Sequence, residues 1–172
     1  MARAGFYPVE SGRISFRRDG HWYSDEERIE NPRIALLFSR SIRRNADGSY
    51  LLQVADERAS ITVEDTPYVI TGVEDDGNGA FVIMTNDEVR ERLDPSTLEV
   101  GDADVLYCRV KQGEYRARFL RHAYYHLAEH FVSNDGENFF LTIGGRRYPI
   151  RITARANESY DSAPNPHSSG VN

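Results

Sequence analysis

Residues 13–63, RISFRRDGHWYSDEERIENPRIALLFSRSIRRNADGSYLLQVADERASITV, carry the pattern that decides the fold. Alternating residues on both sides of Asp19-Gly20 predict a β-hairpin, because an Asp-Gly pair favours a two-residue turn between antiparallel strands. Further along, Asn31 is typical of a helix N-cap and Pro32 of a first helical position. The stretch therefore begins with a hairpin and continues into a helix.

The helix is expected over 32–43 because apolar residues recur there at three- and four-residue spacing. Ile34, Leu37, Phe38 and Ile42 form this apolar stripe. Two strands, over 50–54 and 59–63, follow the turn residues that end the helix. The expected order is β-β-α-β-β.

The same order returns after Val105. Strands are expected over 105–110, 115–119, 139–143 and 147–152, with a helix over 120–132 between the two pairs. One helix on a small sheet leaves its core incompletely covered, and a second copy can complete it. We therefore interpret the chain as two divergent β-β-α-β-β repeats. The alternative is that common turn residues recur by chance.

The segment between the two repeats has a different pattern. Runs over 68–73 and 80–85 predict an inserted hairpin, and 86–103 lack helical periodicity and are expected to be a loop with one short strand or turn. The expected organisation is an N-terminal extension (1–12), repeat one (13–63), an inserted hairpin and connection (64–103), repeat two (104–152) and a disordered tail (153–172). The fold class is α+β, mostly antiparallel β with two helices.

Composition limits the possible partners. The 172 residues are 40% hydrophobic and carry a net charge of −6, which argues against a nucleic-acid binder that neutralises phosphates. The chain lacks an apolar run long enough to insert into a membrane, and its opening lacks the apolar segment of a signal peptide. The lone Cys108 is expected to be a core residue and fits a reducing compartment, so we expect a cytoplasmic protein. No sequence motif calls for a cofactor.

A histidine-rich string over 122–130 is one candidate for chemistry. His126, Glu129 and His130 match H-x-x-E-H, a spacing that places two zinc ligands and a carboxylate base together in some metal-dependent hydrolases. The helix pattern instead puts its core stripe on the opposite side, at Leu120, Ala123, Tyr124, Leu127 and Phe131. We favour an exposed histidine face and keep the metal site as the alternative.

The carboxylates that precede Pro67 are a second candidate. Neighbouring residues on an extended chain point to opposite faces, so Glu64 and Asp65 are poorly placed to act together as acid and base. A local turn or capping hydrogen bond explains Asp65 without catalysis. No residue of the chain is therefore predicted to be catalytic.

Aromatic residues recur at comparable places in the two repeats. If the repeats pack face to face, Trp22, Tyr23 and Tyr124, together with Arg121, are expected to line a ligand-binding seam. Core packing is the alternative for each ring.

Four segments resemble the bacterial family DUF1285: 14–23 (ISFRRDGHWY), 29–43 (IENPRIALLFSRSIR), 48–52 (GSYLL) and 61–69 (ITVEDTPYV). The last segment is similar to the family's V-E-D-[AT]-P-[FY] signature. The resemblance implies an α+β domain with repeated motifs, a portion similar to pleckstrin-homology-like barrels, and a role in ligand binding or signal transduction. It transfers no catalytic residue.

These observations together predict a non-enzymatic module that binds a small molecule or a protein segment. A metal-dependent hydrolase and a structural protein–protein interaction domain are the alternatives. Homo-oligomerisation stays open.

Overall fold

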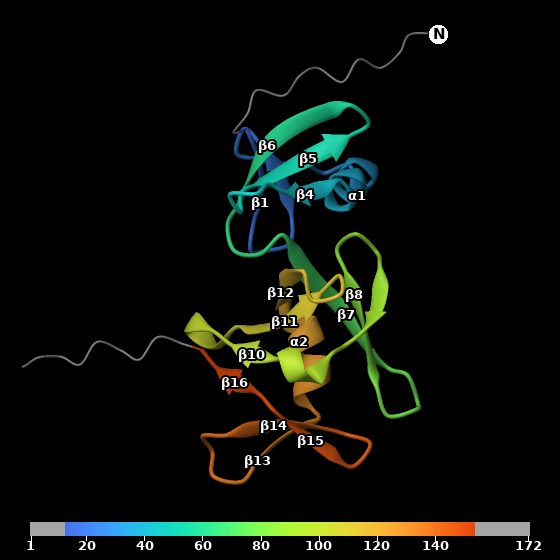
Figure 1. Cartoon of the computed structure of the whole chain (residues 1–172), viewed down its shortest axis with the longest axis vertical. Helices are drawn as coiled ribbons and strands as arrows, with labels where there is room; N and C mark the ends of the chain where they lie inside the picture. Colours follow the sequence, from blue (N-terminus) through green and yellow to red (C-terminus); the bar gives the residue numbers. More distant parts are fainter. Residues whose placement is uncertain (1–12, 154–172) are drawn as a thin grey trace, which may run out of the picture.

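Three β-sheets follow one another along the long axis of the molecule, with the two helices packed beside the first two (Figure 1). The computed structural model describes residues 13–153, and all statements below concern that range. The predicted N-terminal extension 1–12 and almost all of the predicted tail lie outside it. The observed mixture of mainly β structure with two helices confirms the predicted α+β class.

The first sheet has the strand order β3-β2-β1-β6-β5-β4 and packs with helix α1 (Pro32–Arg40). Its strands are β1 (Ile14–Phe16), β2 (Trp22–Ser24), β3 (Glu27–Arg28), β4 (Ile42–Arg44), β5 (Tyr50–Val54) and β6 (Glu57–Val63). β1 pairs with β2 antiparallel and with β6 parallel. The β1–β2 hairpin and the β4–β6 meander are thus joined into one continuous sheet.

Helix α1 is shorter than its sequence pattern predicts. Asn31 caps it as expected, its side-chain oxygen accepting the backbone N–H of Arg33 at 3.0 Å. The helix ends at Arg40, and Ile42 lies on β4 instead, where it pairs with Leu52. A helix of nine residues buries only part of the expected stripe. Ile34 and Leu37 are 41% and 39% exposed, whereas Phe38 is buried.

The second sheet has the order β16-β10-β11-β12-β7-β8-β9. Its strands are β7 (Tyr68–Asp75), β8 (Phe81–Thr85), β9 (Arg90–Arg92), β10 (Glu99–Val100), β11 (Leu106–Val110), β12 (Tyr115–Phe119) and β16 (Arg151–Ile152). The expected loop over 86–103 contributes two of these strands, and 3-10 helices η1 (Pro95–Thr97) and η2 (Asp102–Asp104) lie in or beside it. Cys108 is buried here, as predicted, and burial raises the pKa of its thiol.

The third sheet is a separate meander that follows helix α2 (Arg121–Ala128). Its strands are β13 (Phe131–Ser133), β14 (Phe139–Ile143) and β15 (Arg146–Pro149). The helix was expected to continue to residue 132. It stops four residues earlier because the chain from Phe131 pairs with β14, Phe131 lying opposite Leu141.

Both halves of the chain run through a hairpin, a helix and a three-stranded meander, but their strand pairing differs. In the second half β12 pairs in parallel with β7, which belongs to the inserted hairpin, and the meander stays apart from β11 and β12. The pairing therefore does not confirm the internal repeat, nor does it confirm the barrel similarity. The division into two repeats stays a prediction.

A buried polar network connects the two halves. The Trp22 indole N–H and the Asn86 side-chain amide each donate to the Ser39 hydroxyl at 2.9 Å. The Asn86 carbonyl oxygen in turn accepts the backbone N–H of Val69 at 3.0 Å. Because Ser39 lies on α1 and Asn86 on the β8–β9 turn, this network fixes the first sheet against the second.

Candidate functional site

Trp22, the first of the predicted ligand-binding residues, is a core residue. Its ring centroid lies 4.9 Å from that of Phe16 and 5.5 Å from that of Phe38, in a tilted and an edge-on arrangement. Only 1% of the residue is exposed. Its N–H is satisfied by Ser39, so the packing alternative applies to this ring.

Tyr23 lies on the neighbouring position of β2 and is held by local contacts. Its hydroxyl donates to Asp19 at 2.6 Å, and the Arg17 guanidinium lies over its ring at 4.0 Å from the centroid. The hydrogen bond to Asp19 raises the pKa of the Tyr23 phenol. These contacts attach the ring to its own hairpin.

Arg121 and Tyr124, in contrast, share a groove with a volume of about 370 Å³. Its lining residues come from the β1–β2 turn of the first sheet and, in the second half, from the start of β11, from β12 and from α2. This volume lies within the range of small-molecule sites. We call it the arginine groove; the side chains that give it its chemistry are Arg18, Asp104, Arg118, Arg121, Tyr124 and Tyr125.

The V-E-D-T-P segment (63–67) supplies the carboxylates that pair with two of the three arginines of the groove, Arg18 and Arg118. Glu64 accepts hydrogen bonds from the backbone N–H of Arg18 at 2.8 Å and from its Nε at 2.9 Å. The backbone bond is the main reason that the pKa of Glu64 lies below its usual value. Asp65 accepts from a terminal nitrogen of Arg118 at 2.8 Å. Each carboxylate therefore positions one guanidinium of the groove.

The local turn role expected for Asp65 is thus wrong. Besides Arg118, its carboxylate accepts the hydroxyl of Tyr107 at 3.0 Å, a residue 42 positions away. Thr66 makes the local bond instead, donating its hydroxyl to the carbonyl of Tyr68 at 2.7 Å. The Thr66 oxygen also accepts the backbone N–H of Arg118 at 3.2 Å. Asp65 and Thr66 therefore both bind Arg118 and attach this segment to β12.

Arg121 differs from the other two arginines. Its exposed side chain makes no ion pair or hydrogen bond with any described residue. Asp104, the remaining carboxylate of the groove wall, is likewise unpaired within residues 13–153. The groove therefore offers one guanidinium and one carboxylate that have no partner in the described part of the chain, beside two arginines that are already paired with carboxylates.

The alternative metal site is not formed. Because α2 ends at Ala128, Glu129 is the helix C-cap and His130 lies beyond it. The His130 ring packs on Phe81 with 4.8 Å between centroids, whereas His126 is exposed. Across the described part of the chain, no three His, Cys, Asp or Glu side chains are placed to hold a metal ion.

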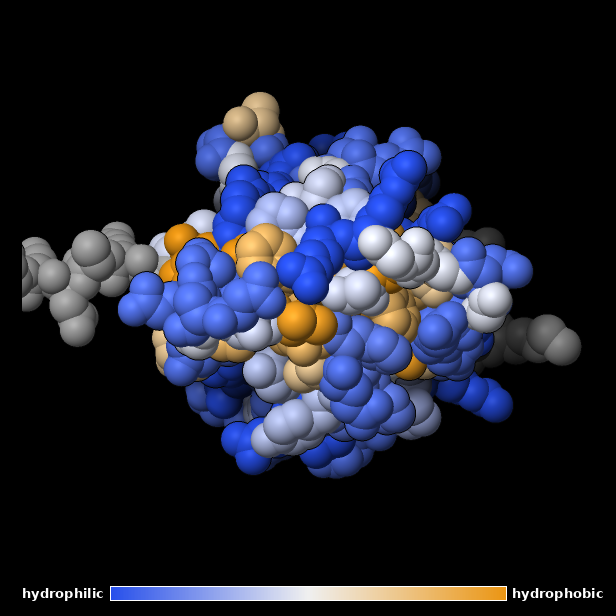
Figure 2. All heavy atoms as spheres, turned by 90° about the horizontal axis from the view of Figure 1, so that it is seen from below, coloured by the Kyte–Doolittle hydropathy of each residue, from blue (hydrophilic) through white to orange (hydrophobic). Residues whose placement is uncertain are grey.

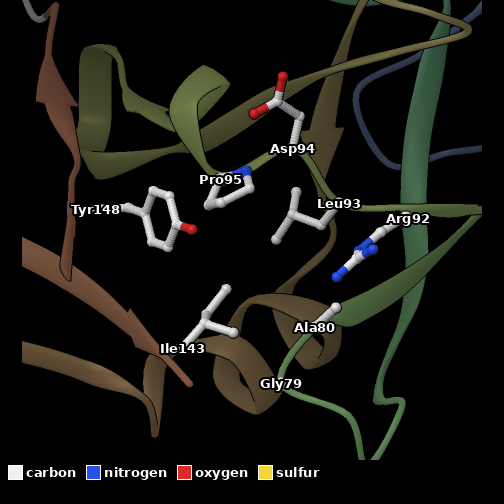
Figure 3. Close-up of a pocket in the computed structure, with 8 residues that line it drawn as sticks. All are labelled: Gly79, Ala80, Arg92, Leu93, Asp94, Pro95, Ile143 and Tyr148. Atoms are coloured by element: carbon white, nitrogen blue, oxygen red, sulfur yellow. The ribbon is translucent and has the colours of Figure 1, made fainter. Parts of the chain in front are cut away.

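Another cavity of about 330 Å³ lies where the third sheet meets the second (Figure 3). The hydroxyl of Tyr148 and the guanidinium of Arg92 point into it, whereas Asp94 points away and caps η1 by accepting the backbone N–H of Ser96 at 3.0 Å. A β-carbon on Gly79 would lie 3.5 Å from the backbone of Gly144. We interpret this region as the contact that holds the meander in place.

Sequence reasoning missed Arg18, Arg118 and Asp104. The signature ITVEDTPYV marks the segment that holds the two arginines, but its partners are 46 and 53 residues away. Nothing in local spacing identifies such pairs. Asp104 lies at the first position of the expected repeat two, where no site was predicted.

A small α+β protein with an arginine groove between its halves is what the fold and site define. Residues 7–66 match the family described as domain of unknown function DUF1285, N-terminal domain. A DUF1285 family protein from Silicibacter pomeroyi DSS-3 has a similar structure, with a TM-score of 0.66 and 22% identity over 87% of this chain and 90% of that one. The predicted resemblance to DUF1285 is therefore confirmed.

A second DUF1285 family protein, from Shewanella baltica OS155, gives a TM-score of 0.56 at 20% identity and covers 72% of this chain and 92% of its own. These identities establish a shared fold. No curated protein matches the chain. Within residues 13–153 the helices are too short and too polar to cross a membrane.

Proposed function

We propose that this protein is a non-enzymatic module that binds a small molecule in the arginine groove. The observation that carries the proposal is Arg121, whose guanidinium has no partner among residues 13–153, in a groove whose other two arginines are each held by a carboxylate. An arginine without a partner can donate several hydrogen bonds to an anionic group of a ligand. The signalling role implied by the DUF1285 resemblance would depend on this binding event.

The chemistry of the groove wall supports binding over catalysis. Its walls contain arginines, tyrosines, one aspartate and apolar residues, and none of the lining residues is a histidine, cysteine, serine or lysine. General acid–base or nucleophilic catalysis most often uses one of these side chains. The arrangement suits holding a ligand in one orientation.

Thermal-shift screening of the full chain against a library of small acids tests the proposal. A ligand at about 100 times its dissociation constant adds roughly 2.7 kcal/mol to stability, which raises the Tm of a protein of this size by about 5–10 °C. We expect at least one acid to give such a shift with the wild type and not with Arg121→Met.

Arg58→Met is the matched control, because Arg58 is exposed on β6 and lies outside the groove. It should keep the full shift. A library without hits, or hits that Arg121→Met leaves unchanged, would contradict the proposed function.

A further inference from the structure

A larger, mostly apolar cavity adjoins the arginine groove. Its volume is about 570 Å³, and it lies between α2, the third sheet and β16. Asp104 and Tyr124 line both the groove and this cavity, so the two spaces meet at these side chains. The apolar walls are formed by Val100, Ala128, Phe131, Phe139, Ile150 and Ile152.

The cavity leaves apolar side chains in contact with solvent. Phe139 is 41% exposed and Ile152 is 59% exposed. Figure 2, which views the molecule from the side of the third sheet, shows hydrophobic residues (orange) at the surface between hydrophilic ones (blue). Covering such a surface with an apolar group is favourable by roughly 25 cal/mol per Å² removed from water.

The two charged residues Asp104 and Arg121 lie at different distances along the path from the apolar cavity into the arginine groove. Asp104 lies where the groove and the cavity meet, and Arg121 lines the groove only. Both are unpaired within the part of the chain that the structure describes, and they do not pair with each other. Ala103 and Asp104 have positive φ angles of 55° and 57°, an unusual backbone for two consecutive non-glycine residues.

We propose that the ligand is a zwitterionic amino acid with an apolar side chain, an inference that rests on the proposed function. Its carboxylate pairs with Arg121 in the groove, its ammonium group with Asp104 at the border, and its side chain extends past Tyr124 into the apolar cavity. This ligand class satisfies both unpaired charges and covers the apolar walls at once.

Other ligand classes leave part of the site unmatched. A simple fatty acid has no cation to place beside Asp104, and an amine without a carboxylate leaves Arg121 unpaired. Glycine carries both charges but leaves the cavity empty. Because unmatched charged groups and uncovered apolar surface both weaken binding, an apolar amino acid is the best fit.

Isothermal titration calorimetry of the full chain with four probes tests the assignment. L-phenylalanine carries all three features, N-acetyl-L-phenylalanine lacks the ammonium, L-phenylalaninamide lacks the carboxylate, and glycine lacks the side chain. We expect L-phenylalanine to bind at least about tenfold more tightly than each of the other three, because a hydrogen-bonded charge or a buried ring contributes a factor of that order.

Three variants assign each feature to its residue. Asp104→Asn should weaken L-phenylalanine about tenfold or more and leave N-acetyl-L-phenylalanine unchanged. Arg121→Met should weaken L-phenylalanine and leave the amide unchanged. Ile152→Ser should weaken L-phenylalanine and leave glycine unchanged. All three residues are exposed, and circular dichroism of each variant verifies folding; Arg58→Met serves again as the control.

Several outcomes would overturn the assignment. The assignment is wrong if N-acetyl-L-phenylalanine or L-phenylalaninamide binds as tightly as L-phenylalanine. It is also wrong if Asp104→Asn leaves the affinity for L-phenylalanine unchanged. A dimer seen by sedimentation that Ile152→Ser dissociates, without L-phenylalanine binding, would show that a second copy covers the cavity. If L-phenylalanine does not bind but another acid binds and its binding depends on Arg121, the amino-acid assignment is wrong and the proposed function is not contradicted. If no acid binds in a way that depends on Arg121, the proposed function and the amino-acid assignment are both wrong.

Discussion

We call the first half of the molecule closed because its hairpin and meander share one sheet, and the second half open because its hairpin and meander lie in separate sheets, although both halves contain a hairpin, a helix and a meander in the same order. In the first half the parallel pairing of β1 with β6 joins hairpin and meander into one sheet. In the second half β12 pairs with β7 instead, and the β13–β15 meander forms a sheet of its own.

The two halves differ in how their aromatic side chains are buried, although Ile34 and Leu37 of the first half are also partly exposed. The closed half buries Phe16, Trp22 and Phe38 against one another. The open half leaves Phe139 and Ile152 partly exposed along a cavity. The same order of elements therefore occurs with two different sheet pairings, in which the first strand of one hairpin pairs with β6 and the second strand of the other pairs with β7.

Truncating one aromatic ring in each half tests this comparison and should give the largest effect. Trp22→Ala should lower the free energy of unfolding by about 3–5 kcal/mol, because it removes a fully buried ring and leaves a cavity. Phe139→Ala should lower it by less than about 1 kcal/mol, because that ring is 41% exposed. Urea unfolding followed by circular dichroism measures both free energies. Tryptophan fluorescence would not serve, because Trp22 is the only tryptophan and the first variant lacks it. Equal losses would show that the second half is as closed as the first.

The junction between the halves should be of intermediate importance. Ser39→Ala removes the acceptor of both the Trp22 indole N–H, which is buried, and the Asn86 amide, which is partly buried, and leaving these donors unpaired should lower the free energy of unfolding by about 1–3 kcal/mol. Ser60→Ala, on the exposed face of β6, is the matched control and should change it by less than about 0.5 kcal/mol. A Ser39→Ala loss no larger than that of the control would mean that the network does not fix the halves together.

Sequence periodicity predicts most elements of the fold but not how they pair. The hairpin around Asp19-Gly20 and the N-cap at Asn31 depend on neighbours in the chain, and both form as expected. Both helices end early because β4 and β13 compete for the same residues through pairing with β5 and β14. Such competition depends on distant strands, so local periodicity overestimates helix length.

The candidate site shows the same limit. Arg121 and Tyr124 were recognisable from their place at the start of a helix, and they share the groove. Arg18 and Arg118 reach it only because Glu64 and Asp65 hold them across 46 and 53 residues. The separation of Trp22 from the groove follows from α1, which covers that ring with Phe38 and Ser39.

The Asp-Gly turns that precede β5 and β14 occupy matching positions in the two halves. The pKa values of their aspartates, Asp47 and Asp135, give the third comparison, for which we expect the smallest effect on stability. In the folded state Asp135 accepts the backbone N–H of Asn138 at 2.8 Å, the side-chain amide of Asn138 at 2.6 Å and the backbone N–H of Glu137 at 3.0 Å, and these bonds lower its pKa to about 2. Asp47 accepts only from Ser49, through the hydroxyl and the backbone N–H, and its pKa is lowered as well.

Because both pKa values are lower in the folded than in the unfolded chain, both turns stabilise the fold fully above the unfolded value near 3.8 and lose this contribution as the pH falls toward 2. Carboxyl carbon NMR titration should place the Asp135 midpoint at about 2 and that of Asp47 below 3.8. Asn138→Ala should raise the pKa of Asp135 and leave that of Asp47 unchanged. If Asn138→Ala left the Asp135 midpoint in place, the side-chain amide of Asn138 would not contribute to the low pKa of Asp135.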